Sequence, residues 1–153
     1  MLDLAIEAVS AASADAIALI AELDDELRRR YETEEVHGLS PRDVEDPETT
    51  FLIGRIAGEA VACGAVRRLN TTTGEVKRMF VRPAYRGQGF SRLILVALER
   101  DASRRGIKTL RLETGTLQPE AIALYQSAGH TGIPLYGEFV GNLRSRCFEK
   151  VLR

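Results

Sequence analysis

Residues 75–106 constrain the possible folds of this chain more than any other segment. They predict a strand over residues 75–81, a loop that contains Gly87 and Gly89, and a helix that ends at Gly106. Glycine lets a backbone approach a ligand closely, and a helix start presents unpaired N–H groups and the positive end of the helix dipole. A strand, a glycine loop and a helix in this order therefore indicate a phosphate-binding site.

Two well-known glycine loops do not fit this segment. A P-loop carries Lys followed by Ser or Thr after its last glycine, and no such pair follows Gly89. A dinucleotide-binding loop has a third glycine, where this chain has Arg92. The sequence thus argues against Mg-nucleotide hydrolysis and against a nicotinamide-dependent oxidoreductase. From the loop alone, a plain strand-to-helix turn stays open as an alternative.

Length and composition predict one globular domain over residues 1–153, with 44% hydrophobic and 28% charged residues. A net charge of −1 argues against a nucleic-acid partner. Neither a cleavable leader nor a membrane-spanning apolar run is evident, so we expect no membrane contact and a cytoplasmic location. Cys63 and Cys147 lie in apolar, strand-like runs and are predicted to be buried free thiols, and no metal-ligand spacing is present, so no metal is expected.

The other segments predict an α/β (α+β) domain. Residues 2–9 indicate a strand, and Ser13 is placed to cap a helix. We expect a hairpin of residues 50–56 and 59–68, a strand over 107–114, a helix from Pro119 to Gly129, a long connection over 131–144 and a last strand over 145–152. A short helical turn is expected near residues 40–44. The strand at 75–81, the helix after the loop and the strand at 107–114 form a parallel crossover.

Spacings of three and four residues predict the buried faces of the first two long helices. In the helix after Ser13 the apolar stripe comprises Ile17, Ile20, Ala21 and Leu27. In the helix after the glycine loop it comprises Phe90, Leu93, Ile94, Ala97 and Leu98.

Two motifs together resemble one enzyme family. Arg86-x-x-Gly89-x-Ser91 resembles the R/Q-x-x-G-x-G/A signature of the GNAT superfamily of N-acetyltransferases, which holds the pyrophosphate of acetyl-CoA, although Ser91 departs from Gly or Ala. Residues 121–129 are similar to the family's A-x-x-L-Y-x-x-x-G helix, and the resemblance extends over roughly residues 50–152. It implies a mixed central sheet that splays open between the strands at 75–81 and 107–114, with the pantetheine arm of the cofactor in the gap.

The resemblance also implies how acetyl-CoA is held as co-substrate. Backbone N–H groups of the loop would surround the pyrophosphate, and backbone groups of the 75–81 strand would pair with the pantetheine amides. The predicted cofactor-binding residues are Met79, Phe80, Val81, Arg86, Gly87, Gln88, Gly89, Phe90, Ser91, Gln118 and Tyr125.

Three residues are candidates for proton transfer. Tyr125, in the L-Y-x-x-x-G part of the motif, is the predicted general acid, because the pKa of a tyrosine, near 10, is close to that of a leaving thiol, near 8.5. Glu75 and Glu113 are rival candidates for the base that deprotonates the amine, and water alone is a third alternative. His130, which follows Gly129, is predicted to be a half-buried packing residue.

The resemblance further implies that the acceptor site is built from residues 31–50 and 133–146. The first segment holds seven acidic residues against one arginine, which would favour a cationic amine. The second holds Tyr136, Glu138, Phe139 and Arg144, of which Arg144 would favour a substrate carboxylate instead. The leading hypothesis is transfer of acetyl to the primary amine of a small molecule. A protein N-acetyltransferase and a non-catalytic acyl-CoA sensor are the alternatives, and a homodimer is an expectation from the resemblance.

Overall fold

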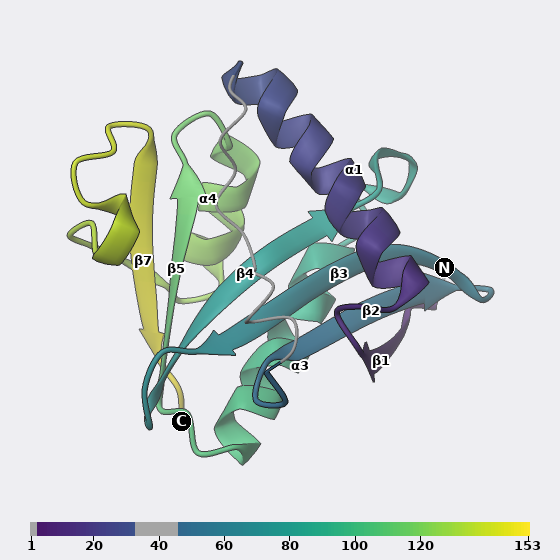
Figure 1. Ribbon diagram of the computed structural model, residues 1–153, viewed down its shortest axis with the longest axis horizontal. Coiled ribbons are helices and arrows are strands. Elements are labelled where there is room, and N and C mark those ends of the chain that lie inside the picture. The colour runs from purple at the N-terminus through teal and green to yellow at the C-terminus, as the bar shows by residue number, and fades with distance from the viewer. Residues whose placement is uncertain (1–2, 33–45) are drawn as a thin grey trace.

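A mixed seven-stranded sheet runs through the computed structural model, which describes residues 3–32 and 46–153 (Figure 1). The strand order is β1-β2-β3-β4-β5-β7-β6. The elements are β1 (Ala5–Val9), α1 (Ala14–Tyr31), β2 (Thr50–Ile56), β3 (Glu59–Arg68), β4 (Thr73–Val81), η1 (Pro83–Tyr85), α3 (Phe90–Arg104), β5 (Thr109–Gly115), α4 (Pro119–Ser127), β6 (Thr131–Ile133), η2 (Gly137–Phe139) and β7 (Ser145–Val151). The predicted α/β class and mixed sheet are confirmed.

All neighbouring strands pair antiparallel except β4 and β5, which are parallel and connected through α3. This parallel pairing joins Thr73–Val76 to Thr109–Leu112 and then stops. The rest of β4 stays paired with β3, and the rest of β5 with β7. The two strands therefore diverge toward their C-terminal ends, as Figure 1 shows, and the predicted splay of the sheet is confirmed.

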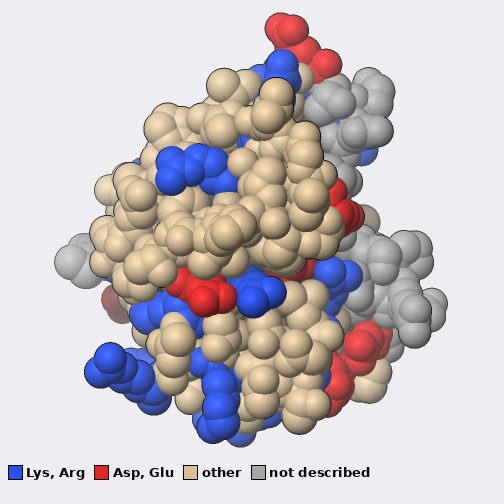
Figure 2. All heavy atoms as spheres, turned by 90° about the vertical axis from the view of Figure 1, so that its left-hand side faces the viewer, with Lys and Arg blue, Asp and Glu red and all other residues tan. Residues whose placement is uncertain are grey.

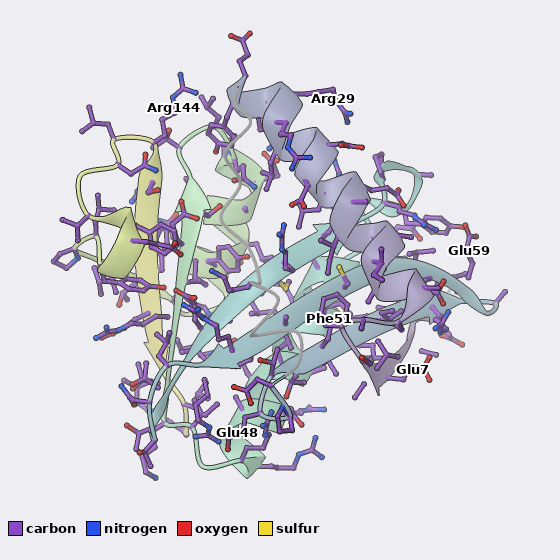
Figure 3. The ribbon with its side chains drawn as sticks, in the orientation of Figure 1. Glu7, Arg29, Glu48, Phe51, Glu59 and Arg144 are labelled. Atoms are coloured by element: carbon purple, nitrogen blue, oxygen red, sulfur yellow. The ribbon has the colours of Figure 1, made fainter. Side chains whose placement is uncertain are left out.

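Helices cover both faces of the sheet and bury two separate cores (Figure 1). Helix α1 packs on one face over Phe51, which lies beneath it in Figure 3. Helix α3 packs on the other face, with α4 beside it. Both predicted helix faces need correction. Ile17 is 56% exposed and α1 instead buries Ala16, Leu19 and Leu23, while in α3 Leu93 is 47% exposed and Leu95 takes its place in the core.

Several local predictions are confirmed and one is wrong. The Ser13 side chain accepts a hydrogen bond from the N–H of Ala16 at the start of α1, and β2 and β3 form the expected hairpin. The connection over residues 131–144 is not irregular throughout, because β6 pairs there with β7 and η2 follows. Both cysteines are buried and free. The turn expected near residues 40–44 lies outside the described residues.

The face on the β7 side carries charges of both signs. Figure 2 shows acidic and basic side chains meeting in a band across the middle of this face, below a largely uncharged upper half. One pair across β5 and β7 is Arg111 with Glu149, at 3.2 Å. Over residues 3–32 and 46–153, none of the helices is both long and apolar enough to span a bilayer.

Candidate active site

A cavity of about 310 Å³ opens where β4 and β5 part. Its wall includes the last residues of β4, the glycine loop, the start of α3, β5 and α4. Among the described residues, backbone groups of β4 that face away from β3 have no strand partner beyond Val76. Such an unpaired edge can hydrogen-bond an extended ligand as an added strand would. Of the predicted residues, Met79, Phe80 and Val81 all line this cavity.

The glycine loop lies at the same cavity. Gly87 and Gly89 have φ angles of +80° and +81°, which side-chain-bearing residues rarely adopt, and a Cβ at either position would meet nothing within 4 Å. Gly89 is the N-cap of α3 and supplies no side-chain cap. The N–H groups at the start of a helix have no partner within the helix. The loop therefore leaves a polar opening beside Phe90 and Ser91, which also line the cavity, whereas Gln88 is exposed and does not.

Arg86 anchors this loop rather than extending freely toward a ligand. Its Nε donates to the carbonyl of Val81 at 2.8 Å, its Nη2 to Glu26 of α1 at 2.8 Å, and its guanidinium lies 5.5 Å from the centre of the Phe80 ring. Arg92, on the exposed side of α3, donates to Ser127 of α4 at 2.5 Å. The two arginines thus connect the loop to α1 and α3 to α4.

Tyr125 faces the cavity from α4 and is only 6% exposed. Burial raises the pKa of its phenol above the ordinary value, and the charge of Glu113 raises that pKa further. A tyrosine is already protonated at neutral pH, as a proton donor must be. The raised pKa makes the phenol a weaker acid, so its pKa lies further from that of a leaving thiol than the sequence alone predicted. Gln118 lines the cavity too, but its side-chain oxygen accepts from the N–H of Gly115 at 3.1 Å and from the hydroxyl of Tyr31 at 3.2 Å.

Glu75 is buried inside the sheet rather than at its edge. Strand β4 begins at Thr73, two residues earlier than predicted, and Glu75 is 2% exposed. Its carboxylate lies 3.1 Å from Arg67 and 3.3 Å from Lys77, and it accepts a hydrogen bond from Tyr136 at 2.5 Å. Burial raises the pKa of Tyr136, and the charge of Glu75 raises it further. Glu75 is therefore a buried carboxylate with several partners and not a solvated group at the end of a strand.

Glu113 faces the cavity from the neighbouring strand β5. The hydroxyl of Ser145 on β7 donates to its Oε2 at 2.6 Å. Burial raises the pKa of Tyr125 and of Tyr31, and the negative charge of Glu113 adds to both shifts. The structure thus brings both candidate bases and the candidate acid to one cavity.

The sequence did not predict that α1 forms one wall of the cavity. Helix α1 contributes Leu23, Glu26, Leu27 and Arg30, whose spacing of three and four residues places them on one side of a helix. That spacing was available in the sequence as a signal. Phe139 of η2, expected on the acceptor side, also lines the cavity. Most of the acidic segment at 31–50 cannot be placed, since residues 33–45 lie outside the described part of the chain.

His130 is more deeply placed than predicted. It is 2% exposed, its Nε2 lies 3.3 Å from Glu99 of α3, and its ring contacts that of Tyr125 edge-on at a centroid distance of 5.8 Å. The expectation of a half-buried packing residue is therefore corrected to a fully buried, hydrogen-bonded one.

Solved structures of acyltransferases share this fold with its open mixed sheet. A structure from Klebsiella pneumoniae, described provisionally as an acyl-CoA N-acyltransferase, is 34% identical, covers 98% of each chain and has a TM-score of 0.83. An acetyltransferase of the GNAT family from Elizabethkingia anophelis with acetyl-CoA bound shares the fold at 17% identity, with a TM-score of 0.72 over 97% of this chain and 98% of that one.

The chain belongs to the acetyltransferase (GNAT) family, whose model matches residues 16–130. A curated relative from Azospirillum brasilense, named IAA acetyltransferase, is 38% identical over 138 residues, which are 89% of this chain and 90% of the relative. The predicted family is therefore confirmed, and the protein is an acetyltransferase by membership.

Proposed function

We propose that this protein is an N-acetyltransferase that moves an acetyl group directly from acetyl-CoA to the primary amine of a small molecule. The observation that carries the proposal is the meeting of three features in one cavity. They are the unpaired edge of β4, the glycine loop at the start of α3, and the buried phenol of Tyr125. The name of the Azospirillum brasilense relative supports an acetyl transfer.

The residues present fit acetyl-CoA. The open space at Gly87 and Gly89 leaves room for a pyrophosphate beside the start of α3, where N–H groups and the helix dipole favour an anion. The unpaired edge of β4 around Met79, Phe80 and Val81 fits the amides of a pantetheine arm. Bound there, acetyl-CoA would supply the activated acetyl group.

The side chains of this chain would then manage the protons and the developing charge. One carboxylate, Glu113 or Glu75, takes a proton from the ammonium so that the neutral nitrogen can form the C–N bond. A backbone N–H of β4 stabilises the oxyanion of the tetrahedral intermediate. As the C–S bond breaks, Tyr125 donates its proton to the thiolate. The nitrogen loses its second proton as the amide forms, and this proton returns to the Tyr125 phenolate, while the carboxylate releases the first proton to solvent. Acetyl-CoA and amine thus yield amide and CoA.

The acceptor end of the cavity suits a small molecule with an apolar portion. Leu23 and Leu27 of α1 and Phe139 of η2 supply apolar surface, and Glu113 supplies a negative charge that attracts an amine in its ammonium form. These contacts favour a free amine over a peptide main chain, which carries its own hydrogen-bonding groups. The homodimer, the cytoplasmic location and the single domain remain expectations beside this proposal.

The test is turnover of acetyl-CoA against a panel of primary amines, followed by thiol release, with thermal shift by acetyl-CoA and CoA measured in parallel. Gly89→Glu should abolish both the shift and turnover, because it places a carboxylate and a strained φ in the anion site. Gly58→Glu is the matched control, since Gly58 also has a positive φ, of +86°, and open space around its Cβ but lies in the turn between β2 and β3 and does not line the cavity.

Each alternative has its own result in this experiment. A thermal shift without thiol release for any small amine, together with release on a peptide amine, would assign a protein N-acetyltransferase. A shift without release on any amine would assign a sensor. Absence of any shift would overturn the cofactor site itself.

A further inference from the structure

His130 is joined to Tyr125 through both main chain and side chain. Its N–H donates to the carbonyl of Tyr125 at 2.9 Å, where α4 ends. Its imidazole lies edge-on to the Tyr125 ring, with the ring planes at 67°. Tyr125 lines the cavity whereas His130 does not, so the imidazole supports the tyrosine ring from behind.

Glu99 fixes the imidazole in turn. A carboxylate can only accept, so the contact of 3.3 Å between His130 Nε2 and Glu99 Oε2 places a proton on Nε2. The other carboxylate oxygen accepts from Lys150 of β7 at 2.7 Å, and Lys150 also donates to the carbonyl of Ala128 at 2.8 Å. Three elements, α3, β7 and the end of α4, therefore meet at one anchored ring.

The second imidazole nitrogen of His130 lowers the stability of the folded state. Nδ1 of His130 is buried and has no hydrogen-bond partner within the described part of the chain. A buried polar atom without a partner destabilises a fold and calls for an explanation. A phenylalanine side chain could fill the same space without a buried unpaired nitrogen, but it could not form a hydrogen bond with Glu99. Histidine, unlike phenylalanine, is held in one orientation by this hydrogen bond.

We propose that His130, anchored by Glu99, is a positioning residue that holds the Tyr125 phenol in the orientation from which it protonates the leaving thiolate. This inference rests on the proposed function. Small misplacements of a reacting group lower rates by up to about a hundredfold. Loss of the support should therefore reduce kcat and leave the binding of acetyl-CoA, which lies on β4 and the glycine loop, unchanged.

A double-mutant cycle tests the proposal with acetyl-CoA and the best amine of the panel. His130→Ala should lower kcat about tenfold with the acetyl-CoA KM unchanged, and Glu99→Gln should lower it less. In a Tyr125→Phe background His130→Ala should have no further effect, because the phenol it positions is already absent. Gln126→Ala, an exposed neighbour on α4, is the control. Equal losses in both backgrounds, or an unchanged kcat for His130→Ala, would overturn the proposal.

Ring dynamics give a readout that does not need turnover. In NMR with isotope-labelled tyrosine, the Tyr125 ring, assigned through Tyr125→Phe, should flip faster in His130→Ala than in the wild type. His130→Phe should fall between them, because it keeps a ring edge but loses the anchor. An unchanged flip rate would overturn the positioning role even in an active enzyme. Faster flipping in a protein that turns over no amine would leave the support in place and reject the proposed function instead.

Discussion

Tyr125 combines two properties that a proton donor in a buried site needs. It reaches the cavity, and its phenol, whose pKa burial raises above the ordinary value, carries its proton at neutral pH. We predict that Tyr125→Phe lowers kcat by roughly tenfold to a thousandfold with little change in acetyl-CoA affinity. Steady-state thiol release gives kcat, and thermal shift gives the affinity. An unchanged kcat would remove Tyr125 from the mechanism.

The two candidate bases differ in what already surrounds them. Glu75 forms ion pairs with Arg67 and Lys77 and accepts a hydrogen bond from Tyr136. Glu113 accepts a hydrogen bond from the hydroxyl of Ser145 and faces the cavity from β5. We expect Glu113→Gln to lower kcat/KM at neutral pH more than Glu75→Gln does, and the loss to shrink at high pH, where the amine is already neutral. Glu75→Gln should instead lower the melting temperature. Full activity of both variants at neutral pH would leave water as the acceptor of the proton.

Helix α1 is joined to β4 and to the loop that follows it by pairs of opposite charge. Arg78, which occupies a left-handed conformation in β4 with φ of +60°, pairs with Asp24. Arg82 in the following loop pairs with Glu22 at 2.7 Å, and Arg86 with Glu26. Each arginine therefore fixes part of the segment that lines the cavity. The side chains of Arg78 and Asp24 are only 7% and 18% exposed, so this pair is the most deeply buried of the three.

Removal of one partner of that pair leaves the other charge buried. We predict that Asp24→Asn reduces the free energy of unfolding by about 3 kcal/mol, the low end for a broken buried pair, and weakens acetyl-CoA binding because Arg78 lies in β4, which carries the proposed pantetheine edge. Denaturant unfolding and thermal shift measure the two effects. Asp25→Asn is the matched control, since Asp25 is 64% exposed and lies 3.6 Å from Arg28, a contact within the same helix. Equal stability of both variants would contradict the prediction.

Local chemistry made the elements around the site predictable, and tertiary packing decided the rest. Glycines with positive φ and the Ser13 cap act within a few residues, so the loop, the hairpin and the helix starts were visible in the sequence. The buried face of α1 was not, because Ile17 and Leu19 are both apolar and only packing against Phe51 selects between them. Strand β6 has three residues and depends on β7 for its pairing. The burial of Glu75 depends on partners from other segments, Arg67 and Tyr136.

Across the whole molecule, α1 connects the two halves into which the sheet divides. On the β4 side it carries the acidic partners of the three arginines. On the β5 side Arg30 pairs with Glu120 of α4 at 2.6 Å, and the carbonyl of Tyr31 accepts from Arg144 at 2.8 Å, near the end of the helix in Figure 3. Ion pairs and a hydrogen bond of α1 therefore connect this helix to both sides of the gap between β4 and β5, where the cavity lies.

A second junction between elements, the contact of Glu99 with His130 and Lys150, should make the stability of the whole protein depend on acidic pH. Burial alone would raise the pKa of Glu99, but the hydrogen bonds from His130 and Lys150 outweigh it and hold that pKa below the ordinary value of 4.5. A carboxyl with a lowered folded pKa contributes stability in full above its unfolded pKa and loses it as the pH falls through the folded pKa. We predict that Glu99→Gln lowers the melting temperature at pH 7 and that the difference from the wild type narrows below about pH 4.5. Melting curves from pH 7 to pH 3, with Asp25→Asn as a control that should follow the wild type throughout, measure this. A difference that stays constant over the whole range would show that the variant acts through packing rather than through the charge of Glu99.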